Sequence, residues 1–229
     1  MALRSARDAR HAGTLMFTLQ PTTYTQIWCG NYAAANAQID DLVALAEEKG
    51  AVIWKMLGTV IRGAALALTG KTSEAVQTIS DGIIGYRSTG ANVWMTWAKS
   101  LLALAHADLG QFDDAWRCVE EAMAKISTNN ERWFEAEANR IGGEIALKSP
   151  EPDASKAEAY FERALTVARQ QQAKSWELRA AMSMARLWRD RGKREEAREF
   201  LAPVYGWFTE GFDTCDLNEA KALLDELSS

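Results

Sequence analysis

The stretch Ala51–Gly90 reads AVIWKMLGTVIRGAALALTGKTSEAVQTISDGIIGYRSTG and decides the fold. Apolar residues in its first half recur at the spacing of one helical face, namely Trp54, Leu57, Ile61, Ala65 and Leu68. The second half shows the same spacing at Ala75, Ile79, Ile83 and Tyr86. Gly70 separates the halves, and glycine is common just after a helix end. The stretch therefore predicts two helices over about residues 52–68 and 73–87, with Thr72 or Ser73 capping the second.

The same pattern recurs along the chain with a period of about 40 residues. Three sets of positions carry it, which we call the aromatic, alanine and bulky ladders: Trp54, Trp94, Phe134 and Trp176; Ala35, Ala75, Ala115, Ala157 and Ala197; and Ile39, Ile79, Val119, Phe161 and Leu201. Successive members are 40 or 42 residues apart. A fixed period of this length is typical of a solenoid, in which each unit packs mainly on its neighbours.

Turn residues and small side chains keep the register of the ladders. Turns within hairpins are predicted at Gly30, Gly70, Gly110, Pro150 and Gly192, and turns between hairpins at Gly50, Gly90 and Asn129–Asn130. Small residues that would let paired helices approach closely are Gly58, Ala98, Ala138, Ala180, Gly82, Ala122 and Ala164. Pro21 falls inside an expected helix, where it predicts a kink or a helix start. The two prolines of residues 148–153 predict a loop.

These patterns predict an all-α fold, a right-handed helical-hairpin solenoid of about five hairpins plus a C-terminal capping helix. The predicted single domain, 1–229, divides into the back half of a truncated repeat (1–12), repeats at 13–50, 51–90, 91–130, 131–172 and 173–212, and the capping helix (213–229). Asp216 and Glu219 have the spacing of a capping box, and an apolar stripe follows at Leu217, Ala220, Leu223, Leu224 and Leu227.

The beginning of the chain predicts a longer native protein. Residues 1–12 match only the back half of a second helix, and repeat arrays usually protect their ends with atypical caps. We therefore expect the native polypeptide to continue upstream of Met1. The alternative is a natural short cap that starts at Met1.

The repeat unit resembles the tetratricopeptide repeat. The resemblance rests on an aromatic residue, a small residue four later, a glycine turn, then alanine with a bulky residue at +4 and a small one at +7. The resemblance covers about residues 14–212. Each unit is of a long variety, with about 40 residues. The last 70 residues, with LAPVYGWFTEGFDT at 201–214, more narrowly resemble the C-terminal repeat region of bacterial proteins that join a nucleotide-cyclase and an AAA-type ATPase domain. The Gly-x-x-x-x-Gly-Lys-Ser/Thr phosphate loop is not found in this sequence.

Composition excludes several function classes. The 229 residues carry a formal net charge of −5, and neither half of the chain is basic, so nucleic-acid binding has no electrostatic support. No apolar run approaches the length of a membrane span, and no signal-peptide pattern opens the chain. Three cysteines, far apart and in no metal-ligand spacing, suit a reducing compartment. We expect a cytoplasmic protein with no cofactor, no metal and no membrane or nucleic-acid partner.

The resemblance implies that the first helix of each hairpin lines a concave groove. Transfer by the register of Trp54 gives these candidate binding residues: Lys55, Thr59, Arg62, Asn92, Lys99, Arg132, Glu135, Asn139, Lys174 and Glu177, with Val52, Met95, Leu102 and Ala181 between them. An acidic segment or a peptide carboxylate could pair with four of its cations, namely Lys55, Arg62, Lys99 and Arg132. The alternative is an ordinary solvated helix face.

Two further clusters have both a functional and a structural interpretation. Arg186, Arg189, Arg191, Lys193, Arg194 and Arg198 could dock an acidic partner, or could complement helix termini and nearby glutamates. Tyr205, Trp207, Phe208 and Phe212 could form a docking patch, or could pack under the C-terminal helix.

The expected function is a non-catalytic scaffold for protein–protein or interdomain interaction. By the resemblance, it would be the regulatory or sensor tail of a larger bacterial signalling ATPase or nucleotide cyclase, and its partner a protein, a peptide or an upstream domain of the same polypeptide. One alternative is a stand-alone cytoplasmic adaptor. A less favoured alternative is an α-helical domain that binds a small ligand or acts as an enzyme, for which the sequence shows no paired carboxylates or nucleophile–base set.

Overall fold

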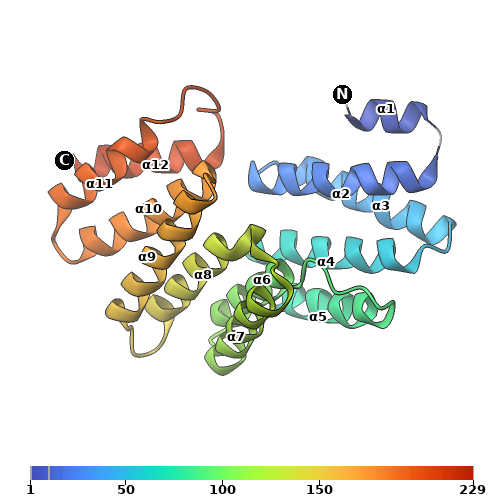
Figure 1. Ribbon diagram of the computed structural model, residues 1–229, viewed down its shortest axis with the longest axis horizontal. Coiled ribbons are helices and arrows are strands. Elements are labelled where there is room, and N and C mark those ends of the chain that lie inside the picture. The colour runs from blue at the N-terminus through green and yellow to red at the C-terminus, as the bar shows by residue number, and fades with distance from the viewer. Residues whose placement is uncertain (1, 10, 229) are drawn as a thin grey trace. The chain divides into compact units, whose positions relative to one another are not determined.

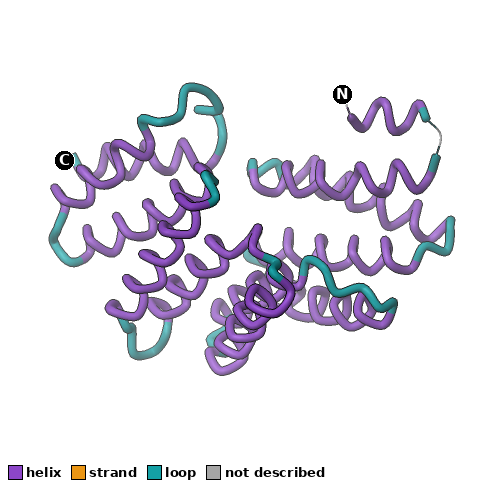
Figure 2. Tube along the Cα trace, viewed as in Figure 1, coloured by secondary structure: helices purple, strands orange, loops and turns teal. Residues whose placement is uncertain are grey.

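The computed structural model describes residues 2–9 and 11–228, and this part of the chain is helical with no strand (Figures 1 and 2). The helices, in chain order, are α1 (Ala2–Asp8), α2 (Ala12–Trp28), α3 (Tyr32–Glu48), α4 (Val52–Leu68), α5 (Thr72–Ser88), α6 (Met95–Asp108), α7 (Phe112–Asn129), the 3₁₀ turn η1 (Arg132–Phe134), α8 (Glu135–Lys148), α9 (Ala154–Gln170), α10 (Lys174–Asp190), α11 (Arg194–Tyr205) and α12 (Cys215–Leu227). Within each of the two units described below, consecutive helices pack against each other, which confirms the predicted all-α helical-hairpin fold.

The chain separates into two compact units, Met1–Leu109 and Gly110–Ser229. In the first unit, hairpins α2/α3 and α4/α5 pack in series, α1 lies on α2, and α6 lies on α4 and α5. In the second unit, α7 packs on α8, hairpins α8/α9 and α10/α11 follow, and α12 covers α10 and α11. The prediction of a single array did not include this division.

Each unit has its own core, built from the alanine and bulky ladders. All ten ladder residues are buried: Ala35, Ala75, Ala115, Ala157, Ala197, Ile39, Ile79, Val119, Phe161 and Leu201. In the second unit, Leu217, Ala220, Leu223 and Leu227 of α12 join the same core, which confirms the predicted apolar stripe and its capping position. The period in the sequence therefore corresponds to packing between helices.

The predicted glycine turns have the left-handed backbone that closes a helix. Gly30, Gly50, Gly70, Gly90, Gly110 and Gly192 have φ between 61° and 83°. Two residues with side chains occupy the corresponding positions in later turns between hairpins, Asn130 (φ 53°) and Gln172 (φ 54°). An L residue in this region is strained relative to glycine, less so for asparagine than for glutamine.

Three local predictions were wrong. Thr72 and Ser73 do not cap α5, because the Gly70 turn brings the amide of Lys71 onto the Leu66 carbonyl and makes Lys71 the N-cap. The helix after the second member of the aromatic ladder begins at Met95 and not at Asn92, the position that the register of Trp54 matches to Val52, because Trp94 has a left-handed backbone (φ 69°). Asp216 does not cap α12, whose N-cap is Thr214, because its carboxylate accepts from Arg179.

Pro21 does not start a helix, because α2 runs through it from Ala12 to Trp28. The missing proline N–H leaves the carbonyl four residues earlier without its helical donor. That residue is Phe17, whose side chain is exposed, so water can reach this turn. Burial of Leu19, Tyr24 and Ile27 on the other face of α2 then outweighs the local cost of the proline.

Candidate functional site

The first five candidate groove residues, from Lys55 to Lys99, lie in the first unit, and the two charged ones on α4 are paired. The Nζ of Lys55 is 2.8 Å from Glu47, and an Nη of Arg62 is 2.8 Å from Asp40, both carboxylates belonging to α3. Thr59 donates its hydroxyl to the carbonyl of Lys55. The charges of both cations are therefore balanced within the unit, in ion pairs exposed enough to exchange partners.

Asn92 and Lys99 do not lie on the same helix, because α6 begins only at Met95. Asn92 is exposed and precedes the helix, so the register of Trp54 does not apply to it. Lys99 lies on α6, where it lines a cavity of about 390 Å³ with Ser80, Ile83, Ile84, Arg87 and Leu102. This cavity has an apolar floor between α5 and α6 and two cations beside it.

The candidates of α8 are joined to one another instead of facing solvent. Glu135 is buried and its carboxylate accepts from Arg132 at 2.8 Å and from Arg163 of α9 at 3.0 Å. Asn139, also buried, donates its side-chain amide to the carbonyl of Glu135 at 2.8 Å. Arg132 remains exposed, at the 3₁₀ turn before the helix.

Lys174 and Glu177 form a similar arrangement at the start of α10. Glu177 is buried and accepts from Lys174 at 2.7 Å and from Arg169 of α9 at 2.9 Å. Burial alone would raise the pKa of Glu177, but hydrogen bonds and charge attraction from Lys174 and Arg169 outweigh it and lower that pKa. The carboxylate therefore stays ionised and holds both cations at the turn between α9 and α10.

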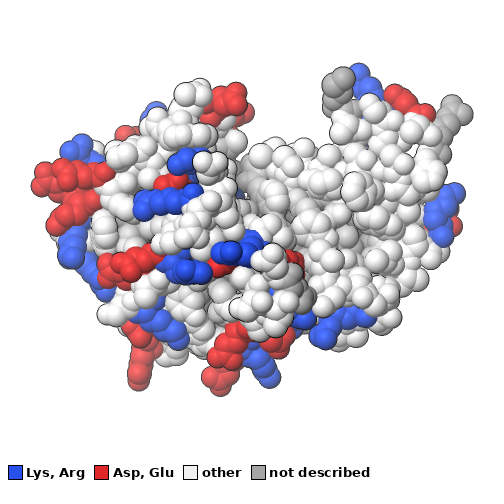
Figure 3. Space-filling model, viewed as in Figure 1, with Lys and Arg blue, Asp and Glu red and all other residues white. Residues whose placement is uncertain are grey.

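An exposed apolar surface of the first unit lies on α2 and α4. Phe17 of α2 is 67% exposed, and Val52 and Ile53 in the first turn of α4 are 55% and 40% exposed. The ring of Trp54 joins the helices through an edge-to-face contact with Phe17, with centroids 6.3 Å apart. We call Phe17, Val52, Ile53 and Trp54 the apolar patch. The face of the first unit drawn in Figure 3 carries few charged side chains.

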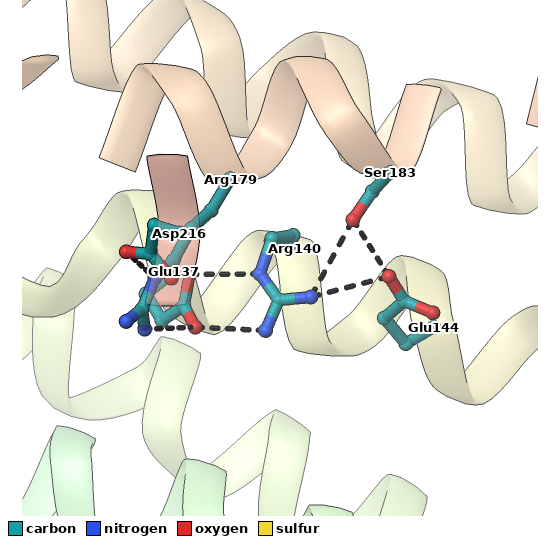
Figure 4. A network of polar contacts seen from close by, with 6 residues as sticks. All are labelled: Glu137, Arg140, Glu144, Arg179, Ser183 and Asp216. Atoms are coloured by element: carbon teal, nitrogen blue, oxygen red, sulfur yellow. Dashed lines mark hydrogen bonds and ion pairs between the residues drawn. The ribbon is translucent and has the colours of Figure 1, made fainter. Parts of the chain in front are cut away.

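The second unit instead contains a polar network that the groove prediction missed. Figure 4 shows its members, which come from α8 (Glu137, Arg140 and Glu144), α10 (Arg179 and Ser183) and α12 (Asp216). Arg140 donates to both carboxylate oxygens of Glu137 at 2.8 Å, and to Glu144 at 3.1 Å. Ser183 donates to the same oxygen of Glu144 at 2.6 Å.

Arg179 connects this pair to the C-terminal helix. Its Nε donates to Asp216 at 2.7 Å, and its Nη1 lies 3.5 Å from Glu137. Glu137 is the most enclosed charged member, with a side chain only 5% exposed. Asp216 of α12 and the buried Glu137 of α8 both face Arg179 of α10, so the network connects three helices and helps to position α12.

The pKa values of two carboxylates of this network, Glu137 and Asp216, are shifted in opposite directions. Burial would raise the pKa of Glu137, but Arg140 and then Arg179 lower it below its ordinary value. Burial raises the pKa of Asp216, and the attraction of Arg179 does not fully offset it. Glu137 therefore stabilises the folded unit as an anion, whereas ionised Asp216 carries a desolvation cost.

Much of the basic cluster around α10 and α11 contacts carboxylates of its own unit. Arg186 pairs with Glu219 at 3.1 Å, Arg189 with Glu226 at 3.0 Å, and Arg191 with Glu158 at 2.6 Å. Arg194 donates to the carbonyl of Glu226. Several of these contacts hold α12, which supports the structural interpretation of the cluster.

The C-terminal aromatic residues divide between the two interpretations. Tyr205 and Phe208 are partly buried and pack against the core of the second unit, which includes residues of α12. Trp207 and Phe212 are 57% and 47% exposed. The exposed pair therefore remains available to a ligand or partner.

Within the described residues, no group of three or more His, Cys, Asp and Glu side chains could hold a metal ion. In the same part of the chain, every helix is too short or too polar to cross a membrane. No protein-family model matches the sequence, and a search of curated proteins found no match.

Proposed function

We propose that this chain is a non-catalytic scaffold that binds a protein segment, either a separate protein or another domain of its own polypeptide. The observation that carries the proposal is the apolar patch on α2 and α4. Three of its side chains, Phe17, Val52 and Ile53, are largely exposed although the unit has a well-packed core. Large apolar side chains grouped in this way are typical of interaction sites.

The position of the patch fits this function. α2 and α4 are the first helices of consecutive hairpins and contact each other directly. In a hairpin solenoid the first helices form a continuous surface on which an extended or helical segment can lie. Val52 and Lys55 are also neighbouring positions of the predicted groove, so the patch and the nearest groove cation would meet the same ligand.

We further propose that the scaffold is the cytoplasmic regulatory tail of a larger bacterial signalling ATPase or nucleotide cyclase, with tetratricopeptide-like repeats. The ladder of period about 40 residues and the C-terminal stretch at 201–214 support this assignment. A ligand that binds the patch would act by shifting how the scaffold contacts the catalytic domains. That step rests on analogy between folds.

A capture experiment tests the proposal. The protein would be used as bait in cells that naturally produce it, beside a Phe17→Ser/Ile53→Ser variant and an Ile84→Ser control. Ile84 is 69% exposed on α5, outside the patch, so all three forms should fold alike by circular dichroism. We expect a protein that is enriched with the wild type and the control but lost with the double variant. Equal recovery with all three forms would contradict the patch as the binding surface.

A further inference from the structure

A second candidate site lies in the unit formed by residues 110–229, apart from the polar network. The turn between α9 and α10 and the loop after α11 border an open cavity of about 420 Å³. It is lined by Arg169, Gln172, Lys174 and Trp207. This volume falls within the range of small-molecule sites, roughly 300–1,000 Å³.

A buried carboxylate holds the two cations of this cavity, Arg169 and Lys174, in place. Buried Glu177 accepts from the Nε of Arg169 at 2.9 Å and from the Nζ of Lys174 at 2.7 Å. Two cations and one carboxylate leave a net charge of +1. Because the Glu177 carboxylate fixes both side chains, less conformational entropy is lost when they bind an anion.

Arg169 keeps most of its hydrogen-bonding capacity. Within the described residues, the contact with Glu177 uses only its Nε and leaves both Nη groups for a ligand. The terminal nitrogens of a guanidinium match the oxygens of a phosphate or a carboxylate. The side chain is about half exposed, so a ligand can reach it.

Trp207 gives the cavity a planar wall. Its ring is 57% exposed and lies 5.5 Å from the Nζ of Lys174. An exposed indole next to a cation offers a stacking surface for a planar ring. Gln172 adds an amide with donors and an acceptor. It has a left-handed backbone (φ 54°) at a turn position where six other turns of the chain, such as those at Gly50 and Gly90, have glycine.

We infer that this cavity binds a small anion that carries a planar ring, of the size and chemistry of a nucleoside monophosphate. The ring would stack on Trp207, the Gln172 amide would bond its polar edge, and Arg169 with Lys174 would bind the phosphate. The set of one ring, one amide and two cations within a single cavity favours a compact ligand over an extended protein segment. This inference does not depend on the apolar patch, which lies in the other unit.

Calorimetric titration of the whole protein with adenosine monophosphate at low salt tests the inference. We expect saturable binding with a Kd below about 1 mM, at least about tenfold tighter than for adenosine or inorganic phosphate alone. Arg169→Gln and Trp207→Ala should each weaken binding about tenfold, since each removes one of the two recognised groups.

Matched variants separate the site from general effects. Arg191→Gln removes another arginine paired with a glutamate, and Phe212→Ala removes another exposed aromatic ring. Neither should change the affinity. Absence of saturable binding would overturn the inference, as would equal losses in the matched variants. Binding of an acidic peptide that depends on Arg169 and Trp207, without binding of the nucleotide, would also overturn it and assign the cavity to a protein segment.

Discussion

At the scale of single residues, the close approach of paired helices depends on missing side chains. A Cβ added to Gly63 would lie 2.8 Å from the backbone nitrogen of Ile79, and one on Gly82 would lie 2.9 Å from that of Val60. Both glycines lie at the interface of the α4/α5 hairpin. The sequence predicted the role of Gly82 from its register, whereas Gly63 lies outside the ladders and was missed.

Substitution of these glycines separates packing from backbone strain. Gly63→Ala should destabilise the protein by about 2 kcal/mol, because the added methyl group meets backbone atoms that cannot move away independently. Gly70→Ala should cost about 1 kcal/mol from its φ of +79° alone, because open space surrounds its Cβ. Urea denaturation measures both, and a Gly63 variant no less stable than the Gly70 variant would contradict the packing account.

The buried Glu137 should contribute more to stability than any exposed ion pair. Glu137→Gln removes the charge that both Arg140 and Arg179 face, and should cost about 3 kcal/mol at neutral pH. Glu48→Gln, in an exposed pair with Lys49, is the control and should change stability by less than about 0.5 kcal/mol. Denaturant titration of the two variants measures the difference, and equal values would mean that the network is dispensable.

The pH dependence of this variant has a definite sign. Because the pKa of Glu137 is lowered in the folded state from its ordinary value of 4.5, its stabilisation is complete above that value and is lost as the pH falls through the lower, folded-state pKa. The stability difference between wild type and Glu137→Gln should therefore shrink in that acidic window. Stability curves from neutral to acidic pH measure it, and a difference that grows on acidification would contradict the assignment.

At the scale of helices and turns, periodicity predicted the elements well but not every boundary. The helix predicted over 52–68 is observed as Val52–Leu68, because its apolar face and its glycine turns agree. The errors at Thr72, at the start of α6 and in the helix start considered at Pro21 arose where the three-dimensional surroundings override local preference. These places have a Schellman-type turn at Gly70, a left-handed backbone at Trp94 and a buried face of α2. All three depend on contacts that the spacing of residues in the sequence does not show.

Proline in α2 gives a direct test of this override. Pro21→Ala restores an N–H that can donate to the carbonyl of Phe17, and removes the clash of the ring with the preceding turn. We expect the variant to be more stable by about 1 to 2 kcal/mol, allowing for the greater freedom of the unfolded chain. Thermal unfolding followed by circular dichroism measures the change. A less stable variant would mean that the proline ring has a packing role.

The candidate site could be predicted from sequence only in part. The register predicted that Lys55 and Arg62 lie on one helix, α4. Their partners Glu47 and Asp40 belong to another helix, and no sequence pattern relates them to these cations. Within α8, the spacing of Glu137, Arg140 and Glu144 at i, i+3 and i+7 is visible in the sequence and could have indicated an ion-pair row. Arg179 and Asp216 lie 39 and 76 residues after Arg140, on other helices. Their contacts with this row could be found only from the three-dimensional structure.

At the scale of the whole molecule, two separate cores imply two partly independent folding units. Ile79→Ala should destabilise the unit of residues 1–109, since it removes a fully buried side chain, at a cost of about 3 kcal/mol. Native-state hydrogen exchange should show faster exchange in α4 and α5 and unchanged exchange in α10. Equal acceleration in both units would show that they unfold as one.

The central claim is that the apolar patch on α2 and α4 binds a protein segment, and photo-crosslinking in the producing cell tests it most directly. A benzoylphenylalanine would replace Phe17, and a second version would carry it at Phe212, an exposed ring in the other unit. The account predicts that position 17 forms a crosslink to one defined segment, in another protein or elsewhere in the same polypeptide, and that position 212 does not reach that segment. No crosslink at position 17, or the same products from both positions, would contradict the claim.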